Sequence, residues 1–317
     1  MSISLFDLHC DTSFALLGKN FEQMLDLRSN RCHIDLERAS AFSKYVQCFA
    51  CYTTPLEIMP EGITPVDVLG LEYEHIMHEI KRNHDMIRLA KNSADIQRNC
   101  DDGVMSAVLT LEGSAGYGYD PAALEELYEK GFRIATLGWN EKNCLVGSHC
   151  SGGGLTEKGK QFVREAQRLG IIIDVSHMSD EGFWDVMDIA QAPVIASHSN
   201  SREICSTSRN LTDPMFSAIC ETGGIVGINL YADFLGEVAT LDTVCDHILH
   251  FLELDRTGDH IALGGDLDGC DKLPVDFSGI ESYPSVADRL LDRGLDAGTV
   301  NNIFWNNAMR VFERCCM

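Results

Sequence analysis

The sequence predicts a (β/α)8 barrel, the fold also called the TIM barrel. Strand-like apolar runs recur eight times, helical patterns lie between them, and one barrel of this type can fill a chain of 317 residues. An open doubly wound sheet is the alternative. That fold usually carries a glycine-rich turn after its first strand, where this chain has His9-Cys10-Asp11. The expected strands are Ser4–His9, Tyr45–Tyr52, Met105–Glu112, Phe132–Trp139, Ile171–His177, Pro193–His198, Gly224–Leu230 and His260–Asp266.

Helices are expected between these strands, and several carry end signals. Thr156 and Ser179 stand at N-cap positions, and glycines follow the ends of two helical patterns. Residues 12–44 form an insertion that is long for a loop after a barrel strand, and we expect a short helix or hairpin there over the active face. The expected helices are Val68–Lys91, Pro121–Lys130, Thr156–Leu169, Ser179–Ala190, Asp213–Thr222, Leu241–Leu254, Val286–Asp292 and Val300–Arg314.

Composition narrows the classes of function. The 48 acidic residues against 25 Lys and Arg give a net charge of −23, which is unfavourable for binding nucleic acid or an anionic membrane. The sequence has no apolar run long enough to span a membrane and no signal peptide, so we expect a cytoplasmic protein. The thirteen cysteines follow no framework spacing and are expected to be free thiols. No linker divides the chain, so residues 1–317 are expected to form one domain.

Ionisable residues gather at the predicted carboxyl ends of the strands, where barrel active sites lie. His9 and Asp11 end the first strand, and residues two apart on a strand share a face. Cys10 should therefore point away from them. Other strands end in Glu112, His177, His198 and the pair Asp266 and Asp268.

Each of these residues also has an ordinary structural interpretation. The histidines could be satisfied core residues, and the two aspartates could begin Asx turns. Their convergence at five strand ends favours a metal site instead, because imidazole and carboxylate groups suit divalent transition metals such as zinc. With a shared carboxylate the set suffices for two ions that hold one bridging hydroxide, and an extra aspartate can move protons.

Taken together, these stretches resemble the membrane (renal) dipeptidase family, the M19 metallopeptidases of the amidohydrolase superfamily. The matching segments occur in the family's order and run from residue 7 to residue 313. They are Asp7–Asp11, Leu111–Gly113, Gly154–Gly159, Asp174–His177, Pro193–Ser199, Ser208–Leu211, Gly264–Gly269 and Asn307–Glu313.

The resemblance implies a (β/α)8 barrel with a binuclear zinc site. It implies that His9 and Asp11 bind one Zn²⁺ and that Glu112 bridges this ion to a second. The second ion is bound by His177 and His198.

The resemblance also implies which residues act on the substrate. It selects Asp266 over Asp268 as the catalytic carboxylate beside the metals, together with Glu112. Arg209 is the implied partner of the substrate carboxylate, which suits its forked guanidinium, and Arg202 is the alternative if the alignment slips.

The chain departs from the better-known animal members at one position. Trp139 stands where those proteins carry a substrate-contacting histidine, as in the bacterial branch of the family. Trp139, Asn140 and Tyr231 are expected substrate contacts. Asn140, Asn143 and His149 are candidates for polarising the substrate carbonyl.

The function expected from the sequence is a zinc-dependent dipeptidase for L,L-dipeptides and also L,D-dipeptides. One alternative is another binuclear metal-dependent hydrolase of amides, lactams or esters. An alternative of another class is a non-catalytic barrel scaffold, although none of the five ligand positions is missing. The small dipeptide is the expected partner, and a homodimer is an expectation at the level of the family only.

Overall fold

The computed structural model describes residues 3–18, 21, 23–54 and 62–316. Eight parallel strands follow one another in the order β7-β6-β5-β4-β2-β1-β9-β8. A bridge between Ala196 and Val226 joins the last strand to the first and closes the barrel. The prediction of a TIM barrel is confirmed. The strands are β1 Ser4–Cys10, β2 Lys44–Tyr52, β4 Met105–Glu112, β5 Phe132–Thr136, β6 Ile172–Asp174, β7 Val194–Ile195, β8 Val226–Ile228 and β9 Ile261–Leu263.

One predicted helix is wrong in its last third. The helix expected over Val68–Lys91 is α3, Pro65–Arg82, and it ends at Asn83, whose side-chain amide donates to the Glu79 carbonyl at 2.9 Å. The chain then forms a short strand, β3 (Ile87–Leu89), which pairs with the first half of β4. A helix that was not predicted, α4 (Ser93–Asp101), follows β3.

Most other helices match their sequence signals. The hydroxyls of Thr156 and Ser179 cap α6 and α7 by accepting from backbone amides, and glycines with positive φ end α6 and α8. The last predicted helix, Val300–Arg314, is interrupted by a π-helical turn at Asn302–Asn306. The remaining bounds are α1 Thr12–Ala15, α2 Leu36–Ala39, α5 Leu124–Lys130, α6 Glu157–Leu169, α7 Asp180–Ile189, α8 Asp213–Thr222, α9 Ala232–Leu235, α10 Leu241–Leu254, α11 Tyr283–Asp292, α12 Ala297–Asn301 and α13 Asn307–Cys315.

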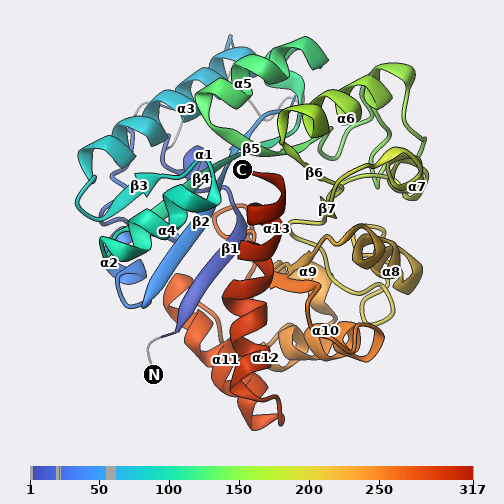
Figure 1. Ribbon diagram of the computed structural model, residues 1–317. Coiled ribbons are helices and arrows are strands. Elements are labelled where there is room, and N and C mark those ends of the chain that lie inside the picture. Colours follow the sequence, from blue (N-terminus) through green and yellow to red (C-terminus); the bar gives the residue numbers. More distant parts are fainter. Residues whose placement is uncertain (1–2, 19–20, 22, 55–61, 317) are drawn as a thin grey trace.

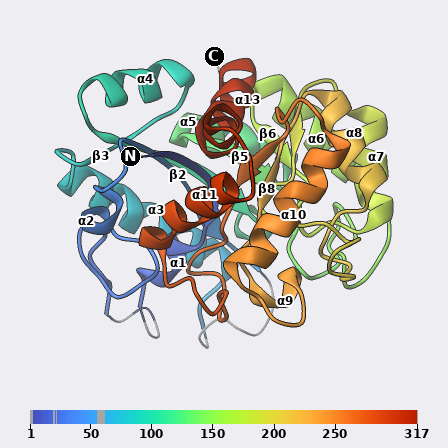
Figure 2. The ribbon, with the colours of Figure 1, turned by 90° about the horizontal axis from the view of Figure 1, so that it is seen from below.

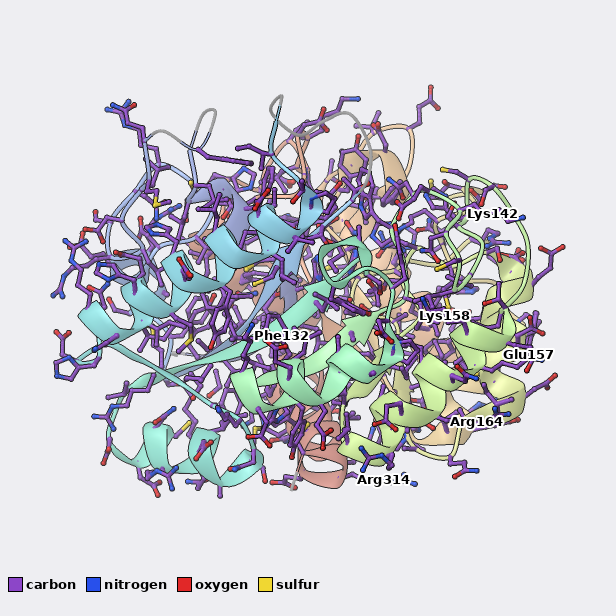
Figure 3. All side chains as sticks on the ribbon, turned by 90° about the horizontal axis from the view of Figure 1, so that it is seen from above. Phe132, Lys142, Glu157, Lys158, Arg164 and Arg314 are labelled. Atoms are coloured by element: carbon purple, nitrogen blue, oxygen red, sulfur yellow. The ribbon has the colours of Figure 1, made fainter. Side chains whose placement is uncertain are left out.

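The helices form a layer around the barrel, and charged side chains cover their outer faces. Glu157, Lys158 and Arg164 of α6 project outward from this layer (Figure 3). The helices α1 and α2 lie in the long insertion after β1, as expected, although residues 19, 20 and 22 of it fall outside the described residues. Among the described residues, no helix is both long and apolar enough to cross a membrane. All thirteen cysteines are free.

The barrel interior is closed at one end by the C-terminal helix. Phe6 and Leu8 of β1 belong to a buried apolar cluster that also contains inward residues of the other strands and Trp305 and Phe312 near the C-terminus. Figure 1 shows α13 lying across this end of the strands. In the turned view, α13 and α4 lie at one end of the barrel, and α1 and α9 lie at the other (Figure 2). Apolar side chains fill the end of the barrel covered by α13, so the candidate site lies at the opposite end, beside α1 and α9, where the strands have their carboxyl ends.

Candidate metal centre

The position of His9 depends on a β-bulge in β1. Asp7 pairs with Gln47 but Cys10 pairs with Phe49, so β1 carries one extra residue between these pairs. Asp7 faces the helix layer, where Tyr283 of α11 donates to its carboxylate, and Leu8 faces the barrel interior. Strict alternation would turn His9 outward with Asp7. The bulge turns it inward instead, toward Glu112 and Asp266.

The next two residues follow the sequence prediction. Asp11 Oδ2 lies 3.9 Å from His9 Nε2, so these side chains share a face. The side chain of Cys10 packs in the core cluster outside the barrel interior. This places Cys10 away from the metal-binding atoms, as predicted.

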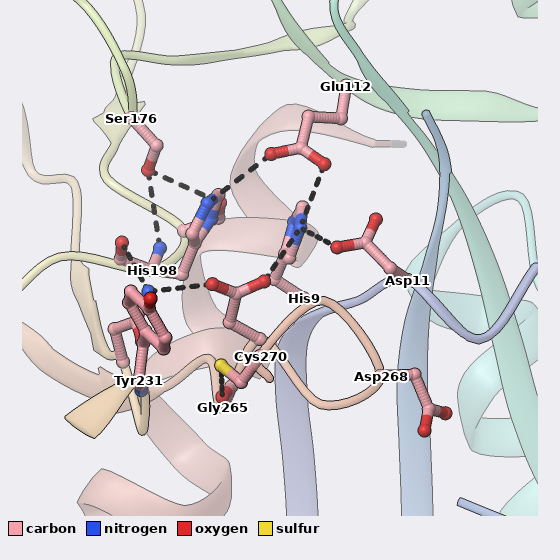
Figure 4. A network of polar contacts seen from close by, with 12 residues as sticks. His9, Asp11, Glu112, Ser176, His198, Tyr231, Gly265, Asp268 and Cys270 are labelled. Atoms are coloured by element: carbon pink, nitrogen blue, oxygen red, sulfur yellow. Dashed lines mark hydrogen bonds and ion pairs between the residues drawn. The ribbon is translucent and has the colours of Figure 1, made fainter. Parts of the chain in front are cut away.

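Glu112 lies at the centre of the cluster. It ends β4 two residues after Thr110 and four after the inward-facing Val108, so regular alternation directs it inward. Its Oε1 atom lies 2.8 Å from His177 Nε2 and 3.5 Å from His198 Nε2, whereas its Oε2 atom lies 3.4 Å from His9 Nε2. Each carboxylate oxygen thus faces a different set of histidines, which is the arrangement that a bridging ligand requires (Figure 4).

The two histidines at β6 and β7 are held by their second ring nitrogens. His177 Nδ1 lies 2.9 Å from Asn140 Oδ1, and His198 Nδ1 lies 2.7 Å from Ser197 Oγ. Ser197 in turn donates to Asp174. These contacts leave both Nε2 atoms directed toward Glu112 and 2.9 Å from each other. Such outer contacts are typical of metal-binding histidines, because they fix the tautomer and the ring orientation.

Several buried polar atoms of the cluster have no hydrogen-bond partner among the described residues, which indicates that the cluster binds a ligand such as a metal ion. His9 Nε2, Asp11 Oδ1 and Glu112 Oε2 are buried without a hydrogen-bond partner among the described residues. Two groups have ligand atoms that all lie within 4.8 Å of one another: His9 with Glu112 and His198, and His9 with Asp11 and Asp266. The donor set of imidazoles and carboxylates fits divalent metal ions.

The electrostatics of the cluster also favour bound cations. Burial raises the pKa of Asp11 well above its usual range, and the charges of Glu112 and Asp266 raise it further. Burial also lowers the pKa of His177 to about 3 and that of His198 well below its usual value. These two imidazoles are therefore neutral at physiological pH. Burial lowers the pKa of His9, but the nearby carboxylates, Glu112 first among them, together raise it by more, to about 9, so His9 would have to release a proton when it binds a cation.

The two aspartates after β9 have different surroundings. Asp266 Oδ1 lies 3.8 Å from His9 Nε2, and its Oδ2 accepts from Asn229 at 3.0 Å. Asp268 points away from this cluster (Figure 4) and is engaged by Thr12 and His33 of the long insertion. The geometry therefore places Asp266 beside the candidate metal positions.

Three of the site residues have left-handed backbone conformations. The φ angles of His177, Asp266 and Asp268 are 70°, 58° and 69°. Such values are uncommon for residues other than glycine and cluster at functional sites, because they aim side chains in directions that regular strands do not allow.

The two candidate arginines differ in how many of their guanidinium nitrogens form hydrogen bonds. Arg202 forms two bonds to Asp180, of 2.7 and 2.8 Å, so its guanidinium is occupied. Arg209 is buried, and among the described residues its guanidinium donates one hydrogen bond, from Nη1 to Ser199 Oγ at 2.8 Å. Its Nε and Nη2 atoms have no partner among the described residues, which is the condition expected of an anion-binding group.

A cavity of about 410 Å³ opens over the cluster. Trp139, Asn140 and Tyr231, the predicted substrate contacts, all line it. Asn143 does not, because its side chain holds backbone groups of Leu137, Leu145 and Val146. His149 does not line the cavity either, and its Nε2 lies 2.9 Å from Asn140 Oδ1. Sequence reasoning missed Phe14, Tyr52 and Phe234 as lining residues, although Tyr52 ends a predicted strand as the ligands do.

Comparison with models of protein families matches residues 1–315 to the family described as membrane dipeptidase (peptidase family M19). The chain belongs to this family. The resemblance seen in the sequence is thereby confirmed, and the chain is an M19 peptidase.

Known relatives of this M19 peptidase include an uncharacterized protein encoded in the pqqA 5′ region of Klebsiella pneumoniae. It is 32% identical over 263 residues, which cover 78% of this chain and 96% of the relative. An uncharacterized dipeptidase of Schizosaccharomyces pombe is 34% identical over 216 residues. That match covers 66% of this chain and 53% of the yeast protein.

Two solved structures share the fold over nearly the full length. A structure named dipeptidase AC, of family M19, is 25% identical with a TM-score of 0.89, covering 100% of this chain and 99% of that one. A metallopeptidase of Rhodobacter sphaeroides, liganded with a phosphinate mimic of L-Ala-D-Ala, is 24% identical with a TM-score of 0.90. It covers 99% of this chain and 100% of that one.

Proposed function

We propose that this M19 peptidase is a zinc-dependent dipeptidase that hydrolyses L,L-dipeptides and L,D-dipeptides. One observation carries the proposal: the metal-binding cluster lies beside Arg209, a buried guanidinium with two unpaired nitrogens among the described residues. A peptidase specific for dipeptides needs both a site for hydrolysis and a charged group that holds the carboxylate one residue away. The phosphinate mimic in the Rhodobacter sphaeroides structure supports a D-residue at the second position.

The proposed metal ligands are those that the family resemblance implies, and the distances within the cluster are compatible with them. His9 and Asp11 would hold one zinc ion, His177 and His198 would hold the other, and Glu112 would bridge them. Bound zinc ions would polarise the scissile carbonyl and supply an activated water at neutral pH.

Asp266 would move the proton. It would accept the proton of the attacking water on Oδ1, the oxygen that faces His9, and pass it to the leaving amine. Among the residues of the chain alone, burial raises the pKa of Asp266 above its usual value. Asn229 holds the other oxygen, Oδ2, and so fixes the orientation of the carboxylate.

The substrate would be placed by residues that line or adjoin the cavity. Arg209 would receive the C-terminal carboxylate, so a peptide extended at that end would lack the charged group that pairs with this guanidinium. Trp139, Asn140 and Tyr231 would contact the rest of the dipeptide. A cavity of about 410 Å³ is suited to a small ligand of this size.

The proposal is tested with purified protein loaded with Zn²⁺ and with the same protein stripped of metal. Both are assayed against paired L,L- and L,D-dipeptides, their C-terminal amides, and unrelated amides, lactams and esters. Zinc-dependent cleavage of dipeptides with free carboxylates is the expected result. Cleavage only of the other substrates would indicate a different metal-dependent hydrolase. A chain that retains far fewer than two ions and cleaves nothing would indicate a scaffold.

A further inference from the structure

Tyr52 lines the cavity of the candidate site together with several of the proposed metal ligands. It ends β2 and pairs directly with Glu112 on the neighbouring strand. Its side chain lines the same cavity as Asp11, Glu112 and Asp266. Only 7% of the residue is exposed. The phenol is thus carried into the site by the same strand-end geometry that delivers the metal-binding residues.

The ring of Tyr52 is held on both sides. It packs edge to face against Trp139 at a centroid distance of 5.0 Å and against Phe14 at 5.6 Å. Its backbone amide donates to the buried carboxylate of Glu72 at 2.6 Å. These contacts restrict rotation of the side chain, so the hydroxyl has a fixed position in the cavity.

The hydroxyl is buried and forms no hydrogen bond of normal geometry among the described residues, although the Thr54 side chain lies close enough to affect its pKa. Other tyrosines of the chain have one: Tyr45 donates to Gln47, Tyr117 to Ser114 and Tyr231 to Asp233. A buried hydroxyl without a partner costs about 1–3 kcal/mol, so a ligand that supplies an acceptor recovers free energy.

The hydroxyl of a tyrosine is ordinarily protonated at neutral pH, with a reference pKa of about 10, so this group is available there as a hydrogen-bond donor. The carboxylates of Glu112 and Asp11 are its charged neighbours, but in the proposed function their oxygens are engaged by metal ions.

We propose that the Tyr52 hydroxyl donates a hydrogen bond to the carbonyl oxygen of the scissile peptide bond. This inference rests on the proposed dipeptidase function. As water adds to the carbonyl carbon, the oxygen gains negative charge, and a fixed donor stabilises that charge without transferring its proton. Trp139, which stands where animal members carry a substrate-contacting histidine, packs on the ring of Tyr52 and orients it. Tyr52 is thus a catalytic residue of this chain.

The substitution Tyr52→Phe tests the inference because it removes only the hydroxyl and preserves the ring contacts. We expect kcat for a cleaved dipeptide to fall on the order of 10²-fold with KM changed less than about threefold. Affinity for a phosphinate dipeptide mimic, whose tetrahedral centre resembles the transition state, should fall by a similar factor. Metal content and melting temperature should stay at the wild-type values.

Tyr128→Phe is the matched control, because Tyr128 lies in α5 and packs on Arg133 outside the barrel. It should behave as wild type. If wild type cleaves dipeptides and Tyr52→Phe retains kcat within about threefold, or loses metal instead of phosphinate affinity, the inference is overturned while the proposed function stands. If wild type itself cleaves no dipeptide, the proposed function fails and the role of Tyr52 fails with it.

Discussion

The side-chain oxygen of Asn140 lies 2.9 Å from Nδ1 of His177. Because this oxygen can only accept, Nδ1 of His177 carries the proton and Nε2 presents its lone pair toward Glu112. Asn140 therefore selects the tautomer in which His177 can bind a metal ion, although the two residues are far apart in the sequence.

Substitution of Asn140 should weaken metal binding at the His177 position. We expect Asn140→Ala to lower the affinity for one of two ions about 10–100-fold, because a contact of this kind fixes both tautomer and ring orientation. Competition with a calibrated chelator measures the two affinities. Asn301→Ala, at an exposed position on α12, is the control and should change neither. Equal affinities in wild type and Asn140→Ala would show that the hydrogen bond is dispensable.

Loss of the charge on Glu112 should affect both ions at once. In Glu112→Gln, neither set of histidines faces a negative oxygen, so we expect the metal content after dialysis to fall from about two ions per chain to well below one. Atomic emission spectroscopy of the dialysed protein measures the number of metal ions per chain. The exposed Glu37→Gln should retain the wild-type content. Retention of one full equivalent in Glu112→Gln would argue against a bridging role.

Asp266→Asn should separate metal binding from turnover. The amide keeps the shape of the side chain beside Asn229 but cannot accept the proton, so we expect kcat to fall on the order of 10²–10⁴-fold. Metal content should remain near the wild-type value. Steady-state kinetics on one dipeptide and metal analysis of the same sample are the measurements. Asp101→Asn, at an exposed position on α4, is the control. Persisting turnover would rule out Asp266 as the proton carrier.

Arg209 should set the preference for a free carboxylate. Wild type should cleave a dipeptide much better than its C-terminal amide, and Arg209→Met should abolish most of that difference by slowing only cleavage of the free acid. Removing one partner of a buried, charge-assisted bidentate pair costs about 2–5 kcal/mol, so the catalytic efficiency toward the free acid should fall at least about 30-fold. Arg202→Gln, whose guanidinium is bound to Asp180, should keep the preference. The preference surviving in Arg209→Met would place the carboxylate elsewhere.

Acid sensitivity should depend in part on His247 of α10. This buried imidazole accepts from the Ser201 amide and contacts the Leu235 carbonyl through its other nitrogen, and burial lowers its pKa to about 4. The unfolded chain takes up this proton near pH 6.5, so the contribution of His247 is complete above that pH and decreases as the pH falls toward 4. Between pH 7 and pH 5 it should account for about 2 kcal/mol of unfolding free energy.

Urea unfolding of the metal-free protein at both pH values measures this contribution. Wild type should lose about 2 kcal/mol more than His247→Gln over this interval, because the other titrating groups are common to both proteins. His78→Gln, at an exposed position of α3, is the control and should follow wild type. Identical pH dependence in wild type and His247→Gln would show that the pKa of His247 is the same in the folded and the unfolded chain.

The fold and the clustering of the candidate metal ligands could be predicted because they depend on local patterns. Strand runs ending in His or an acid are visible one at a time, and the barrel brings their ends together. The strand β3 could not be predicted in this way, since the apolar residues around Ile87 fit the helical period of α3 that precedes them. No local pattern indicates the bulge in β1 either, although the direction of His9 depends on it.

The contacts between residues of the site could not be predicted from local sequence patterns. Asn140 reaches His177 from another strand end, and Tyr52 enters the cavity because its strand pairs with β4 in one particular register. Such relationships arise from tertiary pairing, which a single sequence does not encode in any short motif. The family resemblance favoured Arg209 over Arg202, and the structure adds the physical reason, since Arg202 is bound to Asp180 whereas Arg209 has two nitrogens without a partner among the described residues.

The contacts of Asp268 have a consequence for how the protein is made. Its carboxylate accepts from the Thr12 hydroxyl and from the His33 amide, and its own amide donates to His33 Nδ1. Because β1 also pairs with β9, the strand that carries His9 lacks one of its two neighbouring strands until the chain has been synthesised through Leu263. The first and last strands of the barrel must therefore meet before the segment around His9 and Asp11 is fully enclosed.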